Sequence, residues 1–100
     1  MNVLIVDDEP LARERLRYLL GRLNGFSALE KETGNGREAV ELCNQYKPDI
    51  VLMDIRMPGM GGIEAATHMS QLDEPPAIIF VLPMTVTHSK RLMLRLSAIY

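Results

Sequence analysis

The chain has 100 residues, of which 47% are hydrophobic, and its formal net charge is −2. This length predicts one domain with an apolar core of its own, and the slightly acidic balance gives no electrostatic footprint for nucleic acid or an anionic membrane. The single cysteine, Cys43, excludes an intrachain disulfide framework and favours a cytoplasmic protein. Because the sequence opens directly on a short apolar run, we expect no signal peptide and no membrane span.

The first third of the sequence predicts a strand, a helix and a second strand. Residues 2–6 form a continuous apolar run, which is typical of a buried parallel strand. Pro10 suits the first turn of a helix that should end near Arg22. Residues 27–32 are expected to form a short edge strand. Helical spacing predicts an inward stripe of Ala12, Leu16, Leu19, Leu20 and Leu23, with Arg13, Glu14 and Arg17 on the solvent side.

The following residues continue this alternation. The turn signal at 34–36 precedes a predicted helix over 37–46, and Pro48 separates it from a strand over 49–53. A third helix is expected over 63–72, and a fourth strand over 77–81. The order predicts a parallel α/β sheet with right-handed crossovers. The side chains expected to point inward from these two helices are Ala39, Val40, Cys43 and Tyr46, followed by Ile63, Ala66 and Met69.

Carboxylates follow two of the predicted strands. Asp7 and Asp8 come directly after the first strand, and Asp54 comes at the end of the third. The carboxyl ends of strands in an open α/β sheet form the edge at which ligands bind. Acidic groups that meet there repel one another unless a cation lies between them, and oxygen ligands suit Mg²⁺. The pattern therefore favours an aspartyl phosphoacceptor beside a magnesium site.

Residues 1–80 resemble the receiver domain of bacterial response regulators, in particular the AlgR-like group whose output is a LytTR-type DNA-binding domain. The matching words are V-L-I-V-D-D-E-P-L-A-R-E-R-L, N-G-R-E-A-V, P-D-I-V-L-M-D-I-R-M-P-G-M-G-G-I-E-A-A and P-P-A-I-I-F, in this order. The resemblance implies a flavodoxin-like (CheY-like) doubly wound parallel sheet that is truncated or altered after its fourth strand.

The same resemblance implies roles for four residues. Asp54 would be the phosphoacceptor, taking a phosphoryl group from a sensor histidine kinase or a small phosphodonor. Asp8 would bind Mg²⁺ directly, Asp7 would hold it through water, and the backbone carbonyl of Arg56 would be a further ligand. Such a receiver is not an enzyme in the usual sense, although it assists its own phosphorylation and dephosphorylation.

The sequence departs from the receiver pattern after residue 81. Leu82 stands where receivers carry a Thr or Ser hydroxyl, Pro83 replaces a small residue, and the Lys that follows strand five has no counterpart. We therefore divide the chain into a receiver core over 1–81 and a divergent tail over 82–100, without an output domain. A shifted reading frame would explain the tail, since Met84-Thr85 (ATG-ACN) read two bases later begins with GAC, an Asp codon.

Three functions compete. The leading hypothesis is a phosphoacceptor signalling module that originally regulated transcription. The alternative is a switch-defective pseudo-receiver that acts as a structural or dimerising module, which Leu82 and the missing Lys favour. A phosphatase or phosphotransferase with an aspartyl intermediate ranks last, because such enzymes need a D-x-D motif after the first strand and Asp7-Asp8-Glu9 lacks that spacing. With a fifth strand missing, we expect exposed apolar surface at Ile78, Phe80 and Leu82, and hence a homodimer or higher species. We expect no direct contact of this chain with nucleic acid or membrane.

Overall fold

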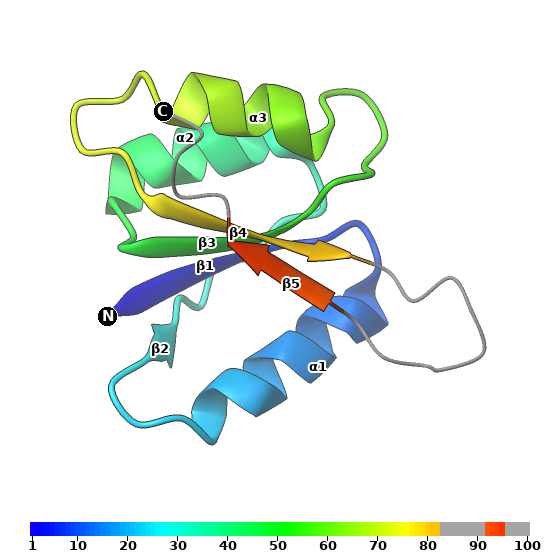
Figure 1. The fold of residues 1–100 in the computed structure, drawn as a ribbon, viewed down its shortest axis with the longest axis vertical. Helices are drawn as coiled ribbons and strands as arrows, with labels where there is room; N and C mark the ends of the chain where they lie inside the picture. The colour runs from blue at the N-terminus through cyan, green and yellow to red at the C-terminus, as the bar shows by residue number, and fades with distance from the viewer. Residues whose placement is uncertain (83–91, 96–100) are drawn as a thin grey trace.

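The computed structural model describes residues 1–82 and 92–95, which form one five-stranded sheet with helices on both faces (Figure 1). The strand order is β2-β1-β3-β4-β5. The first four strands in this order are parallel, and β5 pairs antiparallel with β4. The bounds are β1 Asn2–Val6, α1 Pro10–Gly21, β2 Ser27–Ala28, α2 Gly36–Tyr46, β3 Ile50–Asp54, α3 Gly62–Met69, β4 Ala77–Leu82 and β5 Leu92–Arg95. The expected doubly wound α/β fold is therefore confirmed over its first four strands.

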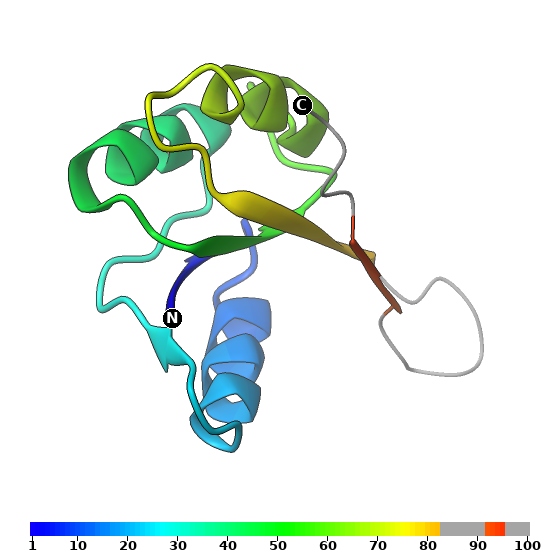
Figure 2. The same ribbon diagram turned by 60° about the vertical axis from the view of Figure 1, so that its left-hand side comes forward.

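The helices lie in two layers. The helices α2 and α3 cover one face of the sheet, and α1 lies on the other (Figures 1 and 2). Pro10 occupies the start of α1, and the side chain of Asn35 caps α2 by accepting a hydrogen bond from the Glu38 backbone N–H. Both strands at the centre of the parallel part, β1 and β3, are almost wholly buried, as their continuous apolar runs predict. Within the described residues, no helix is long and apolar enough to cross a membrane.

Several predicted helix faces need correction. On α1, Ala12, Leu16 and Leu20 are buried, but Leu19 and the following Leu23 are 50% and 54% exposed. Among the described residues, α1 is the only helix on its face of the sheet. Leu19 and Leu23 therefore line an open groove beside it. Arg13 and Arg17 are half-buried because both bind Glu32. Tyr46 and Ile63 are also exposed, and Leu42 and Ala65 fill the inward positions of α2 and α3 instead.

Two element lengths also differ from expectation. The second strand is only Ser27–Ala28, and beyond it Thr33 alone forms an isolated bridge with Val6. The third helix ends at Met69 rather than near residue 72, because the backbone N–H groups of Gln71 and Leu72 bond carbonyls only three residues back, in a tightened last turn.

The region after residue 81 is altered in a way that the sequence did not predict. A fifth strand, β5, is present and covers the edge of β4, with Phe80 opposite Leu94. The expectation that Ile78 and Phe80 are exposed is therefore wrong, since both are fully buried in the core beneath α2 and α3. The described part of the structure does not include the side chain of Leu82 or residues 83–91 and 96–100. The frame-shift hypothesis concerns this tail and stays a prediction.

Candidate functional site

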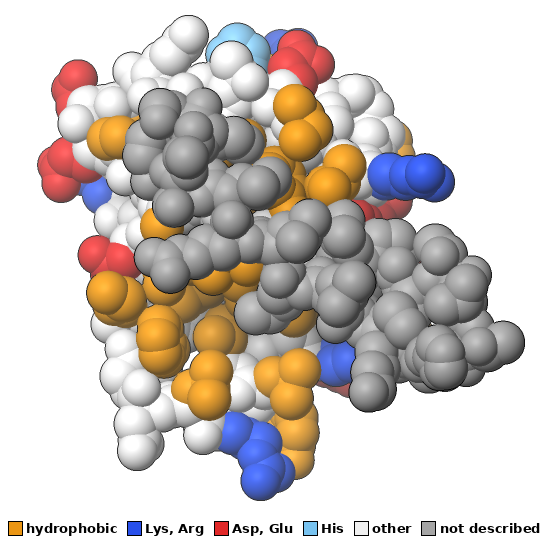
Figure 3. Space-filling model, in the orientation of Figure 1, with side chains coloured by type: hydrophobic (Ala, Val, Ile, Leu, Met, Phe, Trp, Pro, Cys, Tyr) orange, Lys and Arg blue, Asp and Glu red, His pale blue; other side chains and the backbone are white. Residues whose placement is uncertain are grey.

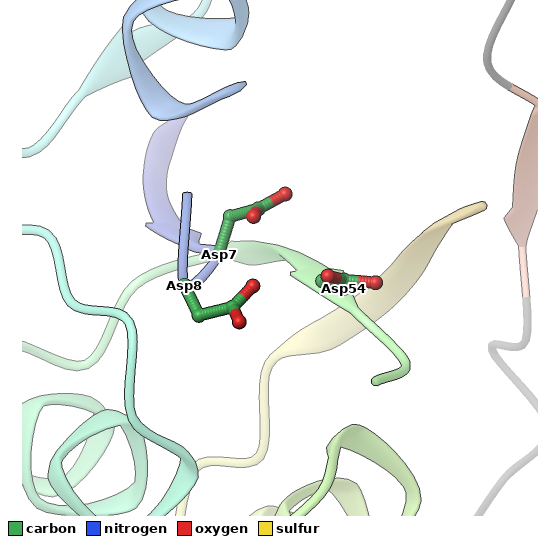
Figure 4. Close-up of side chains that lie close together, drawn as sticks. All are labelled: Asp7, Asp8 and Asp54. Carbon is green, nitrogen blue, oxygen red and sulfur yellow. The ribbon is translucent and has the colours of Figure 1, made fainter. Parts of the chain in front are cut away.

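Three aspartates meet at the carboxyl edge of the sheet. Val6 pairs with Met53 in the parallel register of β1 and β3, so the next residue of each chain segment, Asp7 and Asp54, lies at the same level. Asp8 follows in the loop that leads into α1. One carboxylate oxygen from each of Asp7, Asp8 and Asp54 lies within 4.8 Å of the other two (Figure 4). The structure thus brings together the three carboxylates that the sequence predicted at this edge.

The three carboxylates differ in their surroundings. Asp7 is fully buried, Asp54 is 8% exposed, and Asp8 is exposed. Backbone N–H groups donate to two of them, from Glu9 to Asp7 Oδ1 at 3.0 Å and from Arg56 to Asp54 Oδ1 at 3.2 Å. Three acidic groups this close repel one another strongly at low dielectric. Oxygen donors of this kind and number fit a hard divalent cation, and Mg²⁺ is commonly bound by a few carboxylates with water completing its shell.

Arg56, the fourth predicted residue of the site, lies in the loop after β3. Its side chain is exposed, and its backbone N–H holds Asp54. The role of its carbonyl as a metal ligand stays a prediction.

Glycine brings the start of α3 close to Asp54. A Cβ atom on Gly62 would lie 2.4 Å from the Asp54 carbonyl oxygen and 2.9 Å from the Ile55 Cα. The Gly62 N–H donates to the Ile55 carbonyl at 2.8 Å, which ties the helix start to the end of β3. A larger residue would have to move the phosphoacceptor candidate away from its neighbours. Gly62 comes directly before the predicted helix over 63–72, and its role beside Asp54 was not predicted.

Arg13 is a second residue of the site that sequence reasoning missed, since it was assigned to the solvent side of the helix. Its Nη1 donates to the Asp7 carbonyl at 2.6 Å, and its Nε donates to Glu32 at 2.9 Å. Glu32 also accepts from Arg17. Burial alone would raise the pKa of Glu32, but the hydrogen bonds and charges of Arg17 and Arg13 outweigh it and hold the pKa below its ordinary value. The run of alternate arginines in this helix was the only available signal.

Known proteins are similar in sequence to this chain. A family model of the response regulator receiver domain matches residues 3–96. The positive alginate biosynthesis regulatory protein of Pseudomonas aeruginosa is 58% identical over 80 residues, which are 80% of this chain and 32% of that protein. The transcriptional regulatory protein LytR of Staphylococcus aureus is 45% identical over 82 residues, with the same two coverages of 80% and 32%. The chain therefore spans about a third of the length of these relatives.

Solved structures share the fold. A LuxR-family two-component response regulator from an Aurantimonas species has a TM-score of 0.77 and 37% identity, over 84% of this chain and 59% of that one. The response regulator domain of Thermotoga maritima CheB has a TM-score of 0.77 and 31% identity, over 89% of this chain and 65% of that one. From the family match, the curated relatives and these structures together, the chain belongs to the response regulator receiver domain family.

Proposed function

We propose that this receiver domain accepts a phosphoryl group on Asp54, in the presence of Mg²⁺ held by Asp7, Asp8, Asp54 and the Arg56 carbonyl. The observation that carries this proposal is the meeting of three carboxylates within 4.8 Å at the carboxyl edge of a parallel sheet, two from the residues that follow β1 and one from the end of β3. The phosphodonor would be a sensor histidine kinase or a small acyl phosphate.

Asp54 is suited to act as the nucleophile. Its carboxylate ends a buried strand, is 8% exposed, and keeps Oδ1 bonded to the Arg56 N–H. An Asp54 oxygen would form a bond to phosphorus while the bond from phosphorus to the donor breaks, and the donor imidazole or carboxylate would leave with that electron pair. A bound Mg²⁺ would neutralise negative charge on the carboxylates and on the phosphoryl oxygens. Asp7 and Asp8 hold the remaining negative charge of the site in place for that ion.

Phosphorylation can be tested with acetyl phosphate. We expect the parent chain to gain the mass of one phosphoryl group when it is incubated with acetyl phosphate and Mg²⁺, and the gain to disappear in Asp54→Asn. Asp49→Asn is the matched control, because Asp49 is an exposed carboxylate before the same strand and accepts a hydrogen bond from Asn2. Equal phosphorylation of Asp54→Asn and the parent would refute the proposal.

A second function, a receiver that binds metal but no longer switches, is favoured by Leu82. This residue ends β4 one position beyond Val81, the partner of Asp54, and carries no hydroxyl for a phosphoryl oxygen. A switch needs contacts made only in the phosphorylated state. We expect Mg²⁺ to shift backbone NMR signals near Asp54, and the phosphate analogue beryllofluoride to change neither oligomeric state nor more distant signals. A beryllofluoride-driven assembly would favour the first function.

The chain would act in the cytoplasm as the receiver part of a transcriptional response regulator, since one of its relatives is a transcriptional regulatory protein. A kinase or small phosphodonor would be its partner at the site. The chain itself would make no direct contact with DNA. Its own activity would be limited to assisting phosphoryl transfer and hydrolysis at Asp54.

Self-association through the α1 face is proposed as well. An apolar groove of about 540 Å³ lies between α1 and the sheet, and Leu19, Leu23 and Phe26, which line it, are exposed. Figure 3 shows hydrophobic side chains gathered in the lower half of this view, where α1 lies. Surfaces of this kind favour burial against another chain. We expect sedimentation to show a dimer that Leu23→Glu dissociates. Leu11→Glu is the control, since Leu11 is exposed on the same helix but does not line the groove. A monomeric parent chain would contradict this proposal.

A further inference from the structure

Arg13 links the acidic cluster to Glu32, which lies in the segment between β2 and α2. From the second turn of the helix its guanidinium reaches two partners, the Asp7 carbonyl oxygen through Nη1 at 2.6 Å and Glu32 Oε1 through Nε at 2.9 Å. The side chain is only 19% exposed, so both contacts are largely shielded from water. Hydrogen bonds that involve a charged group are stronger than neutral ones. Arg13 is therefore held from one end by Glu32 and holds Asp7 with the other.

The carbonyl that Arg13 binds belongs to the peptide group between Asp7 and Asp8. This group is planar, so the direction of the carbonyl also fixes the direction of the Asp8 N–H and restrains the Asp8 Cα. On its other side, the Asp7 N–H donates to the Thr33 carbonyl at 2.9 Å. The backbone of Asp7 is thus held at both ends. The side chain of Asp8 is exposed, and the backbone that Arg13 restrains sets the direction of its Cα–Cβ bond.

Gly34 closes the space around this contact. A Cβ atom at position 34 would lie 2.9 Å from the Asp8 Cα, 3.1 Å from the Asp7 carbonyl oxygen and 3.2 Å from Arg13 Nη1. The three groups are therefore packed against the same bare glycine backbone. This independent observation indicates that the Asp7-Asp8 peptide and the Arg13 guanidinium share one tightly fitted position.

Arg17 offers a natural comparison. It also binds Glu32, at 2.7 Å through Nη2, and it also donates to a backbone carbonyl, that of Leu29, at 2.7 Å. Its contacts lie on the far side of Glu32 and do not include Asp7 or Asp8. The two arginines therefore make equivalent bonds to the same segment, and only Arg13 makes one to the acidic loop.

We propose that Arg13 is a positioning residue, which orients the Asp7-Asp8 peptide so that the Asp8 carboxylate is preset for Mg²⁺. The inference rests on the proposed magnesium site. Mg²⁺ requires near-octahedral geometry at short distances, whereas Ca²⁺ accepts flexible geometry at longer ones. A loosened Asp8 therefore weakens Mg²⁺ binding more than Ca²⁺ binding. Loss of an outer partner of a metal ligand typically lowers metal affinity by about 10- to 100-fold.

The test is a titration of the 100-residue chain with Mg²⁺ and with Ca²⁺, followed by the backbone NMR signals of Asp8 and Arg56. We expect Arg13→Lys to lower Mg²⁺ affinity by about tenfold and to lower Ca²⁺ affinity less, so the ratio of the two affinities falls. Arg17→Lys should leave this ratio unchanged. In the metal-free protein, Arg13→Lys should also move the Asp8 amide signal, and Arg17→Lys should leave it in place.

The outcomes distinguish a failure of the proposed magnesium site from a failure of the positioning role of Arg13. If the parent chain binds neither ion, the proposed magnesium site fails and this inference fails with it. If the parent binds Mg²⁺ but Arg13→Lys lowers both affinities equally, or Arg17→Lys lowers the ratio as much, only the positioning role is refuted. If Arg13→Lys does not fold, Glu32→Gln replaces it. We then expect a smaller fall in the same ratio, because Arg13 loses its anchor but keeps the Asp7 contact, and an unchanged ratio overturns the inference.

Discussion

The two faces of the sheet are covered to very different degrees. Beneath α2 and α3, alternate strand residues such as Leu4 and Phe80 are fully buried among the small and apolar side chains of both helices. On the other face, the intervening residues meet only α1 in the described part of the chain, and a groove of about 540 Å³ remains beside them. The same strands therefore build one closed core and one open core.

The two faces of the sheet also hold the two parts of the acidic site, Asp54 on one side and Asp7 with Asp8 on the other, by different contacts. Asp54 is fixed from the closed side, where Gly62 brings α3 against its carbonyl oxygen. Asp7 and Asp8 are fixed from the open side, where apolar packing is sparse and the polar contacts of Arg13 with the Asp7 carbonyl and Glu32 add to it. Close packing of α3 thus helps to position Asp54, the proposed phosphoacceptor, whereas the hydrogen bonds of Arg13 help to position its acidic neighbours.

The largest expected difference comes from the same deletion on each face. Leu4→Ala should lower the free energy of unfolding by about 4 kcal/mol, because a closed core cannot collapse around the cavity. Leu16→Ala should cost about 2 kcal/mol, because Leu16 already borders the groove. Urea unfolding of both variants measures the two values. Equal losses would show that the α1 face is packed as tightly as the other.

A glycine pair sharpens the same comparison. At Gly62 an added methyl group meets backbone atoms at 2.4 and 2.9 Å, whereas at Gly21, the last residue of α1, it meets nothing within 4 Å. We expect Gly62→Ala to cost about 2 kcal/mol through overpacking and to shift the NMR signals of Asp54. Gly21→Ala should be neutral or stabilise the chain by up to about 1 kcal/mol. A tolerated Gly62→Ala would mean that α3 can move away from Asp54.

The buried thiol of Cys43 makes the stability of the closed face depend on pH. Burial raises the pKa of its thiol from 9.0 to about 12. Above pH 9 the unfolded chain releases this proton and the folded chain keeps it, so stability falls as pH rises. One pH unit above the unfolded pKa, the loss should be about 1.4 kcal/mol. It is measured as the change in unfolding free energy between pH 7 and pH 10. Cys43→Ala should lack this part of the decline, and an identical decline in both proteins would contradict the assignment.

Much of the fold follows from short-range patterns. The continuous apolar runs predicted β1, β3 and β4, and the expectation for Cys43 as a small core residue is confirmed by its burial. Because parallel strands share one carboxyl edge, the meeting of Asp7, Asp8 and Asp54 also followed from the order of elements. The metal and phosphoryl roles of these residues stay predictions.

The misses have a common physical cause. Helical spacing predicts that Leu19 lies on the inward side of α1 and Arg13 on the solvent side. It does not predict how much of each side the rest of the protein covers. Leu19 is exposed because the groove is open, and Arg13 is half-buried because Glu32 and the Asp7 carbonyl, distant in sequence, come within hydrogen-bond distance. The strand β5 was not predicted at all, because the periodicity of a short apolar run cannot distinguish a strand from a helix.

The smallest expected effect tests the polar contacts of the open face. Glu32→Gln should lower the free energy of unfolding at pH 7 by about 1 kcal/mol, because two arginines lose their ionic partner at a partly solvated site. The lowered pKa of Glu32 means that its stabilisation is fully present above the ordinary value of 4.5 and is lost as pH falls through the folded-state pKa.

The difference between the parent and Glu32→Gln should therefore shrink as pH falls below about 4.5, and it should also shrink with added salt. Glu30→Gln is the matched control, since Glu30 is an exposed neighbour with no ion pair among the described residues. A pH-independent difference would contradict this prediction, since Gln has nearly the same shape as Glu and only the carboxyl of Glu32 changes its charge in this pH range. The stability of the open face would then not depend on the ionic charge that Glu32 brings to its pairs with Arg13 and Arg17.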